Sequence, residues 1–353
     1  MVKITLPLLI LIFITCACAP GTSTRETITP TTPTTTISDW YTVYFTEPTN
    51  PTAASYRGGI DEALAATIDQ ARISVDMAIY DFNLWSLRDA LIDAHRRGVV
   101  VRVVTDSDNM DELEVQELKD AGIEVLGDRR EGLMHDKFVI IDRSEVWTGS
   151  MNFTTGGGYL DNNNLIRLRS SKVAEDYRFE FEQMFLDDHF GASKTQGTPN
   201  PSITVNDSLI EVYFSPQDGT LEHILEVVKG AHESIYFLAY SFTSDELADA
   251  LIEQVKSGVT VRGIFDKDQY HSNSGTEFDN LRNAGIDVNL DGNPRLMHHK
   301  VIIIDQQIVI TGSYNFSNNA EHNNDENSLI IHNQQIAAEY MAEFQQIYEL
   351  SQR

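Results

Sequence analysis

Six residues recur at one fixed spacing in two stretches of this 353-residue chain, 133–152 and 296–315. Each stretch has a histidine, a lysine two positions later, an aspartate five positions after that, and a final Gly-Ser-x-Asn group. Imidazoles can attack or transfer protons, and ammonium groups stabilise negative charge, so these residue types suit chemistry on an anionic substrate. The first copy comprises His135, Lys137, Asp142, Gly149, Ser150 and Asn152, and the second comprises His298, Lys300, Asp305, Gly312, Ser313 and Asn315.

The surroundings of the two stretches are repeated as well. The runs 43–45 and 212–214 are both Val-Tyr-Phe, and the Ala-Gly-Ile of 121–123 recurs at 284–286. Every motif residue of the second copy lies 163 positions after its counterpart. Because this period is far longer than the roughly 20 to 50 residues of solenoid repeats, the sequence predicts a duplicated domain.

Hydrophobic periodicity predicts the elements that position the motif. In the first copy, alternating or β-branched apolar runs predict strands and a period near 3.6 predicts helices, whereas Gly156-Gly157-Gly158 is predicted to be a flexible loop. Strands that alternate with helices indicate an α/β layer fold. The main predicted strands are 73–80, 99–104, 123–126, 138–141, 145–148 and 165–168, and the helices are 58–71, 84–97, 111–121 and 173–185.

The repeated stretch resembles the HKD signature of the phospholipase D superfamily, and the resemblance covers nearly all of the chain after residue 38. It implies an α/β fold with two duplicated α/β/α lobes, each a mixed sheet flanked by helices. The lobes would be related by pseudo-two-fold symmetry and would share one active-site cleft. Their compactness resembles the small bacterial endonuclease and mitochondrial cardiolipin-hydrolase branch, here with two copies in one chain.

The resemblance also implies a mechanism through a covalent phosphohistidine. By the usual assignment in two-copy members, His135 would be the nucleophile and His298 the general acid, but the near-symmetric site leaves their order open. Lys137 and Lys300 would stabilise charge on the phosphoryl oxygens, so neither a metal ion nor another cofactor is expected. The expected phosphate-binding residues are Lys137, Lys300, Ser150, Asn152, Ser313 and Asn315.

Acidic residues are expected to support the histidines. In the family, a carboxylate after the Gly-Ser-x-Asn group orients an imidazole, and Glu326 occupies such a place in the second copy. We match Asn162 to it in the first copy, so either Asp161 substitutes or the two histidines are not equivalent. Asp142 and Asp305 belong to the motif and are counted among the candidate catalytic residues with the histidines, the lysines and Glu326, although we expect them to bind loop backbone near the site rather than to donate protons.

Other clusters have simpler interpretations. His271, His298, His299 and His322 lack the close spacing of zinc ligands. The aromatic residues before the motif, such as Tyr80 and Tyr240, are predicted to lie in the core or to face the cleft, with the core favoured.

Composition leaves the substrate open. The chain has 26 basic and 53 acidic residues, a net charge of −27, so its overall field does not steer it towards nucleic acid or anionic membranes. A local basic cleft would still be compatible with this charge. Acidity, together with the predicted export and tether, favours hydrolysis of phospholipid headgroups. Cleavage of DNA or RNA, which the branch resemblance favours, is the alternative, and a non-catalytic phosphate-binding module is a third possibility.

The N-terminal residues predict export. Lys3 and the apolar run 4–14 form a signal peptide at 1–18, too short for a membrane span of about 20 residues. Cys16 and Cys18 are the only cysteines, and Cys18 after Ala17 resembles the lipidation site of a bacterial lipoprotein. A plain secretory signal is the alternative. Residues 19–38 are rich in threonine and proline and are predicted to be a tether.

The remaining residues divide into two lobes. We predict a first lobe at 39–190, a polar linker at 191–207 and a second lobe at 208–353. Because both motif copies are in one chain, a monomer should suffice to complete the site. Such a protein would be extracellular or anchored by lipid at the outer face of a bacterial membrane.

Overall fold

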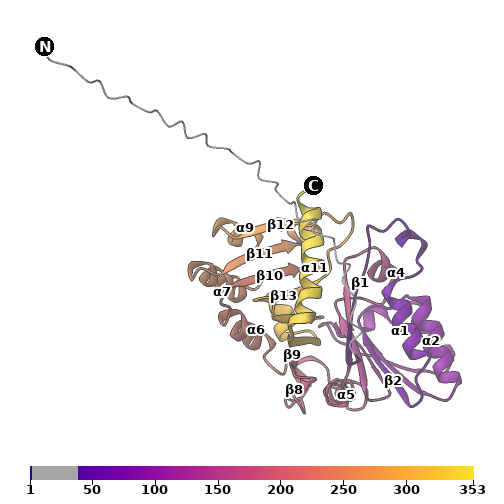
Figure 1. Ribbon diagram of the computed structural model, residues 1–353. Helices are drawn as coiled ribbons and strands as arrows, with labels where there is room; N and C mark the ends of the chain where they lie inside the picture. Colours follow the sequence, from indigo (N-terminus) through magenta and orange to yellow (C-terminus); the bar gives the residue numbers. More distant parts are fainter. Residues whose placement is uncertain (2–38) are drawn as a thin grey trace. The chain divides into compact units, whose positions relative to one another are not determined.

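The computed structural model describes Met1 and residues 39–353, which fold around two mixed sheets (Figure 1). The predicted signal peptide, the lipidation candidates Cys16 and Cys18, and the predicted tether lie outside these described residues. Within the described part of the chain, no helix is both long enough and apolar enough to cross a bilayer.

The first sheet has seven strands in the order β1-β7-β6-β5-β2-β3-β4, and β2, β3 and β4 are parallel while the other pairs are antiparallel. Two strands joined in parallel need a crossover, and helices supply it here. The strands are β1 Tyr41–Phe45, β2 Ser74–Ile79, β3 Val100–Thr105, β4 Glu124–Gly127, β5 Lys137–Ile141, β6 Glu145–Gly149 and β7 Asn164–Arg169.

The second sheet repeats this order and adds one edge strand, giving β12-β11-β10-β13-β14-β15-β9-β8. The common order confirms the duplicated α/β fold. The strands are β8 Ser202–Val205, β9 Ser208–Ser215, β10 Ser234–Ala239, β11 Thr260–Phe265, β12 Asp287–Leu290, β13 Lys300–Ile304, β14 Ile308–Gly312 and β15 Glu326–His332.

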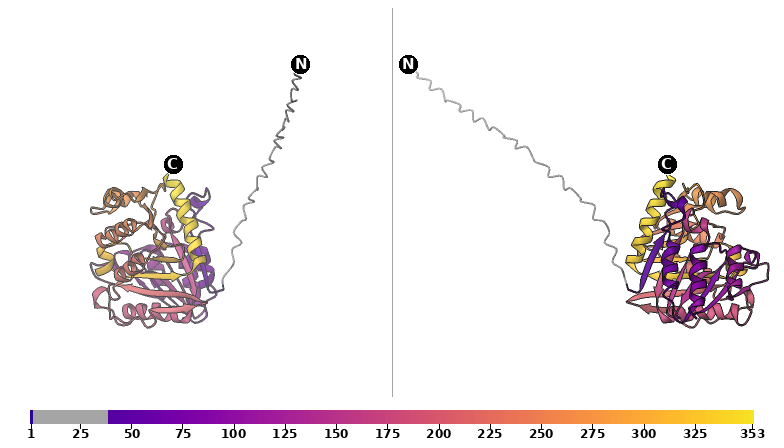
Figure 2. Two further views of the ribbon diagram at one scale, coloured as in Figure 1. Left: turned by 60° about the vertical axis from the view of Figure 1, so that its left-hand side comes forward. Right: turned by 90° about the vertical axis from the view of Figure 1, so that its right-hand side faces the viewer.

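The helices flank the two sheets, and the right-hand view of Figure 2 shows the purple helices of the first lobe in front of their strands. The first lobe has α1 Ile60–Ile68, α2 Trp85–Arg96, α3 Leu113–Asp120, α4 Thr155–Tyr159 and α5 Ser171–Phe185. The second has α6 Thr220–Lys229, α7 Asp245–Lys256, α8 Lys267–Ser272, α9 Phe278–Asn283, α10 Asn318–His322 and α11 Gln334–Ser351.

Helix α2 illustrates how the sequence specifies these elements. Leu87, Ala90, Leu91 and Ala94 are buried and recur at the spacing of one helix face. The helix ends before Gly98, whose φ of +91° is a left-handed conformation that suits glycine. The chain can therefore turn sharply into β3.

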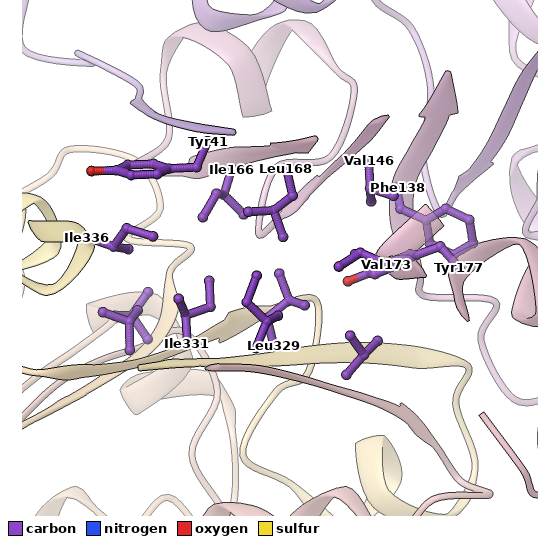
Figure 3. Packing of buried hydrophobic residues seen from close by; sticks show 14 of the residues in the cluster. Tyr41, Phe138, Val146, Ile166, Leu168, Val173, Tyr177, Leu329, Ile331 and Ile336 are labelled. Atoms are coloured by element: carbon purple, nitrogen blue, oxygen red, sulfur yellow. The ribbon is translucent and has the colours of Figure 1, made fainter. Parts of the chain in front are cut away.

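The two lobes share one hydrophobic core. The inner faces of both sheets pack together with α5 and α11, and Figure 3 shows Ile166 and Leu168 of β7 opposite Leu329 and Ile331 of β15. Each sheet also has one further cluster, which lies between the sheet and its outer helices. Each fully buried aliphatic side chain contributes about 1.5 to 3 kcal/mol, so this common core fixes the lobes relative to each other.

Two predicted loops contain regular structure. The segment 191–207, predicted as a linker, contains β8, which pairs with β9 through a turn at Asn206 and Asp207. Both turn residues have positive φ, which asparagine and aspartate tolerate, and Ile203 is buried against the core. The glycines at 156–158 lie in the short helix α4, because the Thr154 side chain accepts a hydrogen bond from the Gly157 amide and caps it.

Candidate active site

The two His-Lys pairs occupy equivalent places at the ends of β5 and β13. His135 and His298 are each 6% exposed, and Lys137 and Lys300 are almost completely buried. Each lysine Nζ donates to the carbonyl oxygen of its own histidine residue, at 2.7 Å in the first copy and 2.8 Å in the second. These bonds hold both ammonium groups beside the imidazoles.

Backbone pairing between the lobes brings the two motifs into one site. The His135 amide donates to the Asp325 carbonyl at 3.0 Å, and the His298 amide donates to the Asn162 carbonyl at 2.9 Å. Isolated bridges join Met134 to Asp325 and Asn162 to Met297. The two motifs therefore meet where each motif strand begins, at the contact with the other lobe.

Glu326 orients the histidine of the opposite lobe. His135 donates from Nδ1 to the Glu326 carboxylate, at 2.8 and 2.9 Å to its two oxygens. Ser313 and Asn324 also donate to this fully buried carboxylate, at 2.7 and 3.3 Å. The bond fixes the tautomer of His135, so its Nε2 is free to act.

The residue equivalent to Glu326 is Asn163, and our matching of Asn162 is wrong. His298 donates from Nδ1 to Asn163 Oδ1 at 3.0 Å. Asn162 instead accepts from Asn293, at 2.7 Å. The constant offset of 163 positions gives Asn163 directly, so the repeat spacing contained this information.

Asp161 does not replace the missing carboxylate. Its Oδ1 accepts from the Arg295 side chain at 3.3 Å and from the Leu296 amide at 3.4 Å. The second alternative is therefore the correct one: the two histidines have chemically different partners.

Asp142 and Asp305 lie away from the site, so their place among the candidate catalytic residues is wrong. Each aspartate follows the end of its strand, whereas the lysine begins that strand. The five positions from the lysine to the aspartate span about 16 Å, at about 3.3 Å per residue. Asp142 accepts from the amides of 72–74 at 2.7 to 3.2 Å, and Asp305 accepts from those of 232–234 at 2.7 to 2.9 Å. The predicted bonds to loop backbone are present, but they connect hairpins to β2 and β10.

The serines of the motif are not available to bind phosphate as expected. Ser150 donates to Asn163 at 2.8 Å, and Ser313 donates to Glu326 at 2.7 Å. A hydroxyl has a single proton to donate, so both serines position the partners of the histidines instead.

The motif asparagines remain candidates for substrate contact. The Oδ1 atoms of Asn152 and Asn315 are buried and find no hydrogen-bond partner among residues 39–353. Such a buried orphan acceptor is costly unless a donor, such as water or a substrate hydroxyl, satisfies it, while the amide nitrogens remain able to donate to a phosphate. Asn152 also lines an open pocket of about 420 Å³, which both lobes form.

Burial and mutual repulsion lower the pKa values of the two lysines and the two histidines, which favours their neutral forms. Burial lowers the pKa of Lys137 to about 8. Burial, followed by repulsion from Lys137, lowers the pKa of Lys300 well below its ordinary value. Burial and the two lysines likewise lower the pKa of both histidines, and His135 contributes to the shift of His298. An anion bound among these groups would reverse the shifts by favouring the charged forms.

Two tyrosines complete the site. The Tyr80 ring centroid lies 5.0 Å from that of His135, and the Tyr240 centroid lies 4.4 Å from that of His298. The lysine Nζ atoms lie 5.3 and 4.6 Å from the same two tyrosine rings. These tyrosines therefore flank the site, whereas their neighbours Phe82 and Phe242 belong to the core.

A second layer, which the sequence analysis missed, crosses between the lobes behind the serines. Asn164 accepts from Thr311 at 3.0 Å and from Tyr340 at 3.1 Å. Asn327 likewise accepts from Thr148 and Tyr177, the residues equivalent to Thr311 and Tyr340. Each partner recurs at the same offset of 163, which is the signal that could have identified the layer.

Within residues 39–353, no three His, Cys, Asp or Glu side chains converge in a way that could hold a metal ion. The groups that converge on the site are imidazoles, ammonium groups and amides. They can stabilise an anion, attack an electrophilic centre and transfer a proton.

Comparison with known proteins identifies both lobes. A family model described as "Cardiolipin synthase, PLD-like domain" matches residues 64–185 and, a second time, residues 224–348. The two matches together cover more than half of the chain, and each contains one copy of the motif.

Individual relatives match a stretch of this chain that is about as long as one lobe. Phospholipase D of Rickettsia prowazekii (strain Madrid E) is 36% identical over 134 residues, which are 38% of this chain and 65% of that protein. Mitochondrial cardiolipin hydrolase of Homo sapiens is 35% identical over 132 residues, 37% of this chain and 52% of that protein. The matches thus span less than two thirds of the length of either curated relative.

A solved structure with a similar fold covers both lobes. The phosphatidylserine synthase of Haemophilus influenzae Rd KW20 is 13% identical and covers 86% of this chain and 85% of its own, with a TM-score of 0.61. That likeness concerns the fold alone. The phospholipase D family member Nuc from Salmonella typhimurium is 31% identical over 40% of this chain and 95% of its own, with a TM-score of 0.38.

Proposed function

The chain belongs to the PLD-like domain family of the phospholipase D superfamily, and on that premise we propose that it hydrolyses phosphodiesters through a covalent phosphohistidine. One observation carries the proposal. Two buried His-Lys pairs from different lobes meet at one site, and each imidazole has its Nδ1 engaged by a partner from the opposite lobe.

The first step joins the enzyme to phosphorus. Neutral His135 attacks with the lone pair of Nε2, and a P–N bond forms as the bond from phosphorus to the leaving oxygen breaks. Protonated His298 gives its Nε2 proton to that oxygen, so an alcohol leaves rather than an alkoxide. The phosphate monoester remains on His135.

The second step restores the enzyme. His298, now neutral, takes a proton from a water molecule, whose oxygen forms a bond to phosphorus as the P–N bond breaks. Lys137 and Lys300 place fixed positive charge beside the oxygens on which negative charge develops, and Asn152 and Asn315 can donate from their amides. These groups supply the electrostatic stabilisation that other phosphodiesterases obtain from metal ions.

We favour a phospholipid headgroup as the substrate. The net charge of −27 opposes attraction of nucleic acid, and Asp81 and Asp161 line the pocket beside Asn152. These carboxylates would repel a neighbouring phosphate but tolerate a cationic alcohol such as choline or ethanolamine. A phospholipase D and a cardiolipin hydrolase among the relatives support this substrate class.

Parallel assays of the full chain test the proposal. Vesicles of phosphatidylcholine or phosphatidylethanolamine, and separately a labelled oligonucleotide, are incubated with the protein in EDTA. We expect headgroup release, and loss of turnover by about 10³-fold or more in His135→Ala and His298→Ala. His232→Ala, an exposed histidine, is the control. Cleavage of the oligonucleotide alone would identify a nuclease, and turnover of neither substrate would indicate a phosphate-binding module.

We also propose that the protein is exported and anchored through a lipid on Cys18, and that it acts as a monomer. Mass spectrometry of the mature N-terminus would detect the lipid, and Cys18→Ser should release the protein from membranes while Cys16→Ser should not. Activity that elutes at twice the monomer mass in size-exclusion chromatography would argue against the monomer.

A further inference from the structure

The two histidines differ in the chemistry of their Nδ1 partners. Every group that contacts the Glu326 carboxylate is a donor: His135 Nδ1, Ser313 Oγ and Asn324 Nδ2. These donors and the nearby Lys137 favour the ionised carboxylate, and they oppose burial, which raises the pKa of Glu326 to about 8.

The environment of Asn163 suits an amide instead. Its Oδ1 accepts from His298 Nδ1 and from Ser150 Oγ, at 3.0 and 2.8 Å. Its Nδ2 donates to the Gly157 carbonyl at 2.9 Å. That carbonyl can only accept, so it fixes the orientation of the amide and would face a second acceptor if residue 163 were an aspartate. A carbonyl of α4 thus holds Asn163, the neutral partner of His298, in one orientation.

The difference decides where a phosphoryl group is stable. A histidine that carries phosphorus on Nε2 and hydrogen on Nδ1 is a cation, whereas the general acid becomes neutral once it has given up its proton. On His135 the cation would face a carboxylate. On His298 its Nδ1–H would face the neutral amide of Asn163 and would lack the carboxylate that His135 has.

We propose that Asn163 is a positioning residue that reserves the covalent step for His135 and leaves His298 as the proton carrier. This inference rests on the proposed phosphohistidine chemistry and orders its two histidines. The proton that His298 gives to the leaving oxygen is recovered from water in the second step, so the Nδ1–H···Asn163 bond persists throughout the cycle.

Adduct mapping tests the assignment. The full chain is mixed with bis(p-nitrophenyl) phosphate, whose leaving group needs little protonation, quenched in alkali and analysed by peptide mass spectrometry. We expect the adduct on His135. His298→Ala should release about one equivalent of p-nitrophenolate and then stall, because no base activates water. His135→Ala should give neither burst nor adduct.

A swap of the two partners tests the role of Asn163 itself. Asn163→Asp with Glu326→Gln exchanges carboxylate and amide with little change in shape, and it should move the adduct to His298. Asn163→Asp alone should shift the alkaline limb of the kcat/KM profile upwards by about one pH unit, since a carboxylate favours the protonated acid. A purely structural role would change the melting temperature but move neither the adduct nor the limb.

The outcomes separate this inference from the proposed function. An adduct on His298 in the unmodified protein would overturn the inference and the order of the two histidines in the proposed cycle, but not the covalent mechanism. An adduct that stays on His135 in a folded swap variant would overturn the inference alone. Turnover of the same substrate without an adduct on either histidine would overturn the covalent mechanism as well. Should the swap variant fail to fold, the alkaline limb of the kcat/KM profile of Asn163→Asp still tests the role of Asn163, and an unchanged limb would overturn it.

Discussion

The Glu326 carboxylate lies 2.8 Å from Nδ1 of His135, although 191 positions separate the two residues. The bond crosses from the second lobe to the first. Neither copy of the motif is therefore complete by itself, because each depends on the other for the group that orients its imidazole.

Glu326→Gln should lower kcat by about 10²- to 10⁴-fold, the range expected when a histidine loses the carboxylate that fixes its tautomer and stabilises its charge. Substrate affinity should change little, since Glu326 does not reach the cleft. Steady-state kinetics would measure this effect. Glu339→Gln is the matched control, because Glu339 of α11 accepts from Tyr41 of β1 and from no residue of the motif.

Lys137→Met should abolish activity and yet raise the free energy of unfolding by about 1 to 3 kcal/mol. The folded-state pKa of Lys137, about 8, lies below its ordinary value of 10.5, so the folded protein bears the cost of this charge at neutral pH. That cost fades as the pH rises from 8 towards 10.5, and the gain should fade with it. Chemical denaturation at several pH values would detect the higher free energy of unfolding and its decline at high pH. A Lys137→Met variant that is less stable than the unmodified protein at neutral pH would refute the reasoning.

Anion binding should take up protons. Burial and the two lysines lower the pKa values of His135 and His298, whereas a bound anion favours their charged forms. Sulfate has a constant charge in this range, so its affinity should rise as the pH falls from about 8 to about 5, by up to about tenfold per pH unit and per linked proton. Calorimetry in two buffers would count the protons. An affinity independent of pH would contradict the shifts.

Asp142→Ala should destabilise the fold by about 1 to 3 kcal/mol without changing kcat per folded molecule, because three backbone amides lose their acceptor. Asp142→Asn should lose less, since asparagine keeps an acceptor and tolerates the φ of +50°. Denaturation and kinetics on the same samples distinguish the two effects. A fall in kcat at unchanged stability would restore the catalytic role that the motif suggested.

Much of the fold could be predicted because local patterns and tertiary packing agree. The apolar spacing in α2 and the β-branched run in β3 match the faces that the core buries. Val100 is an exception: it lies at the start of β3 and is exposed, although an apolar run broken only by Arg102 predicts burial on both faces. Only the position of the neighbouring elements decides how far a sheet is covered.

The site was predicted in part. Repeated spacing identified the histidines and lysines, because their roles follow from their residue types and their positions in the motif. The spacing could not reveal that Ser150 and Ser313 turn away from the substrate, because that depends on Asn163 and Glu326 approaching them from the same lobe. Nor could it reveal that each of these partners serves the histidine of the opposite lobe, which follows from how the lobes pack.

The stereochemistry at phosphorus tests the central claim most directly. A phosphodiester made chiral by one sulfur and by oxygen isotopes would be hydrolysed by the full chain, and the configuration of the product compared with that of the substrate. Two successive in-line displacements, first by His135 and then by water, predict retention. Inversion would mean that water attacks in a single step, and it would contradict the phosphohistidine.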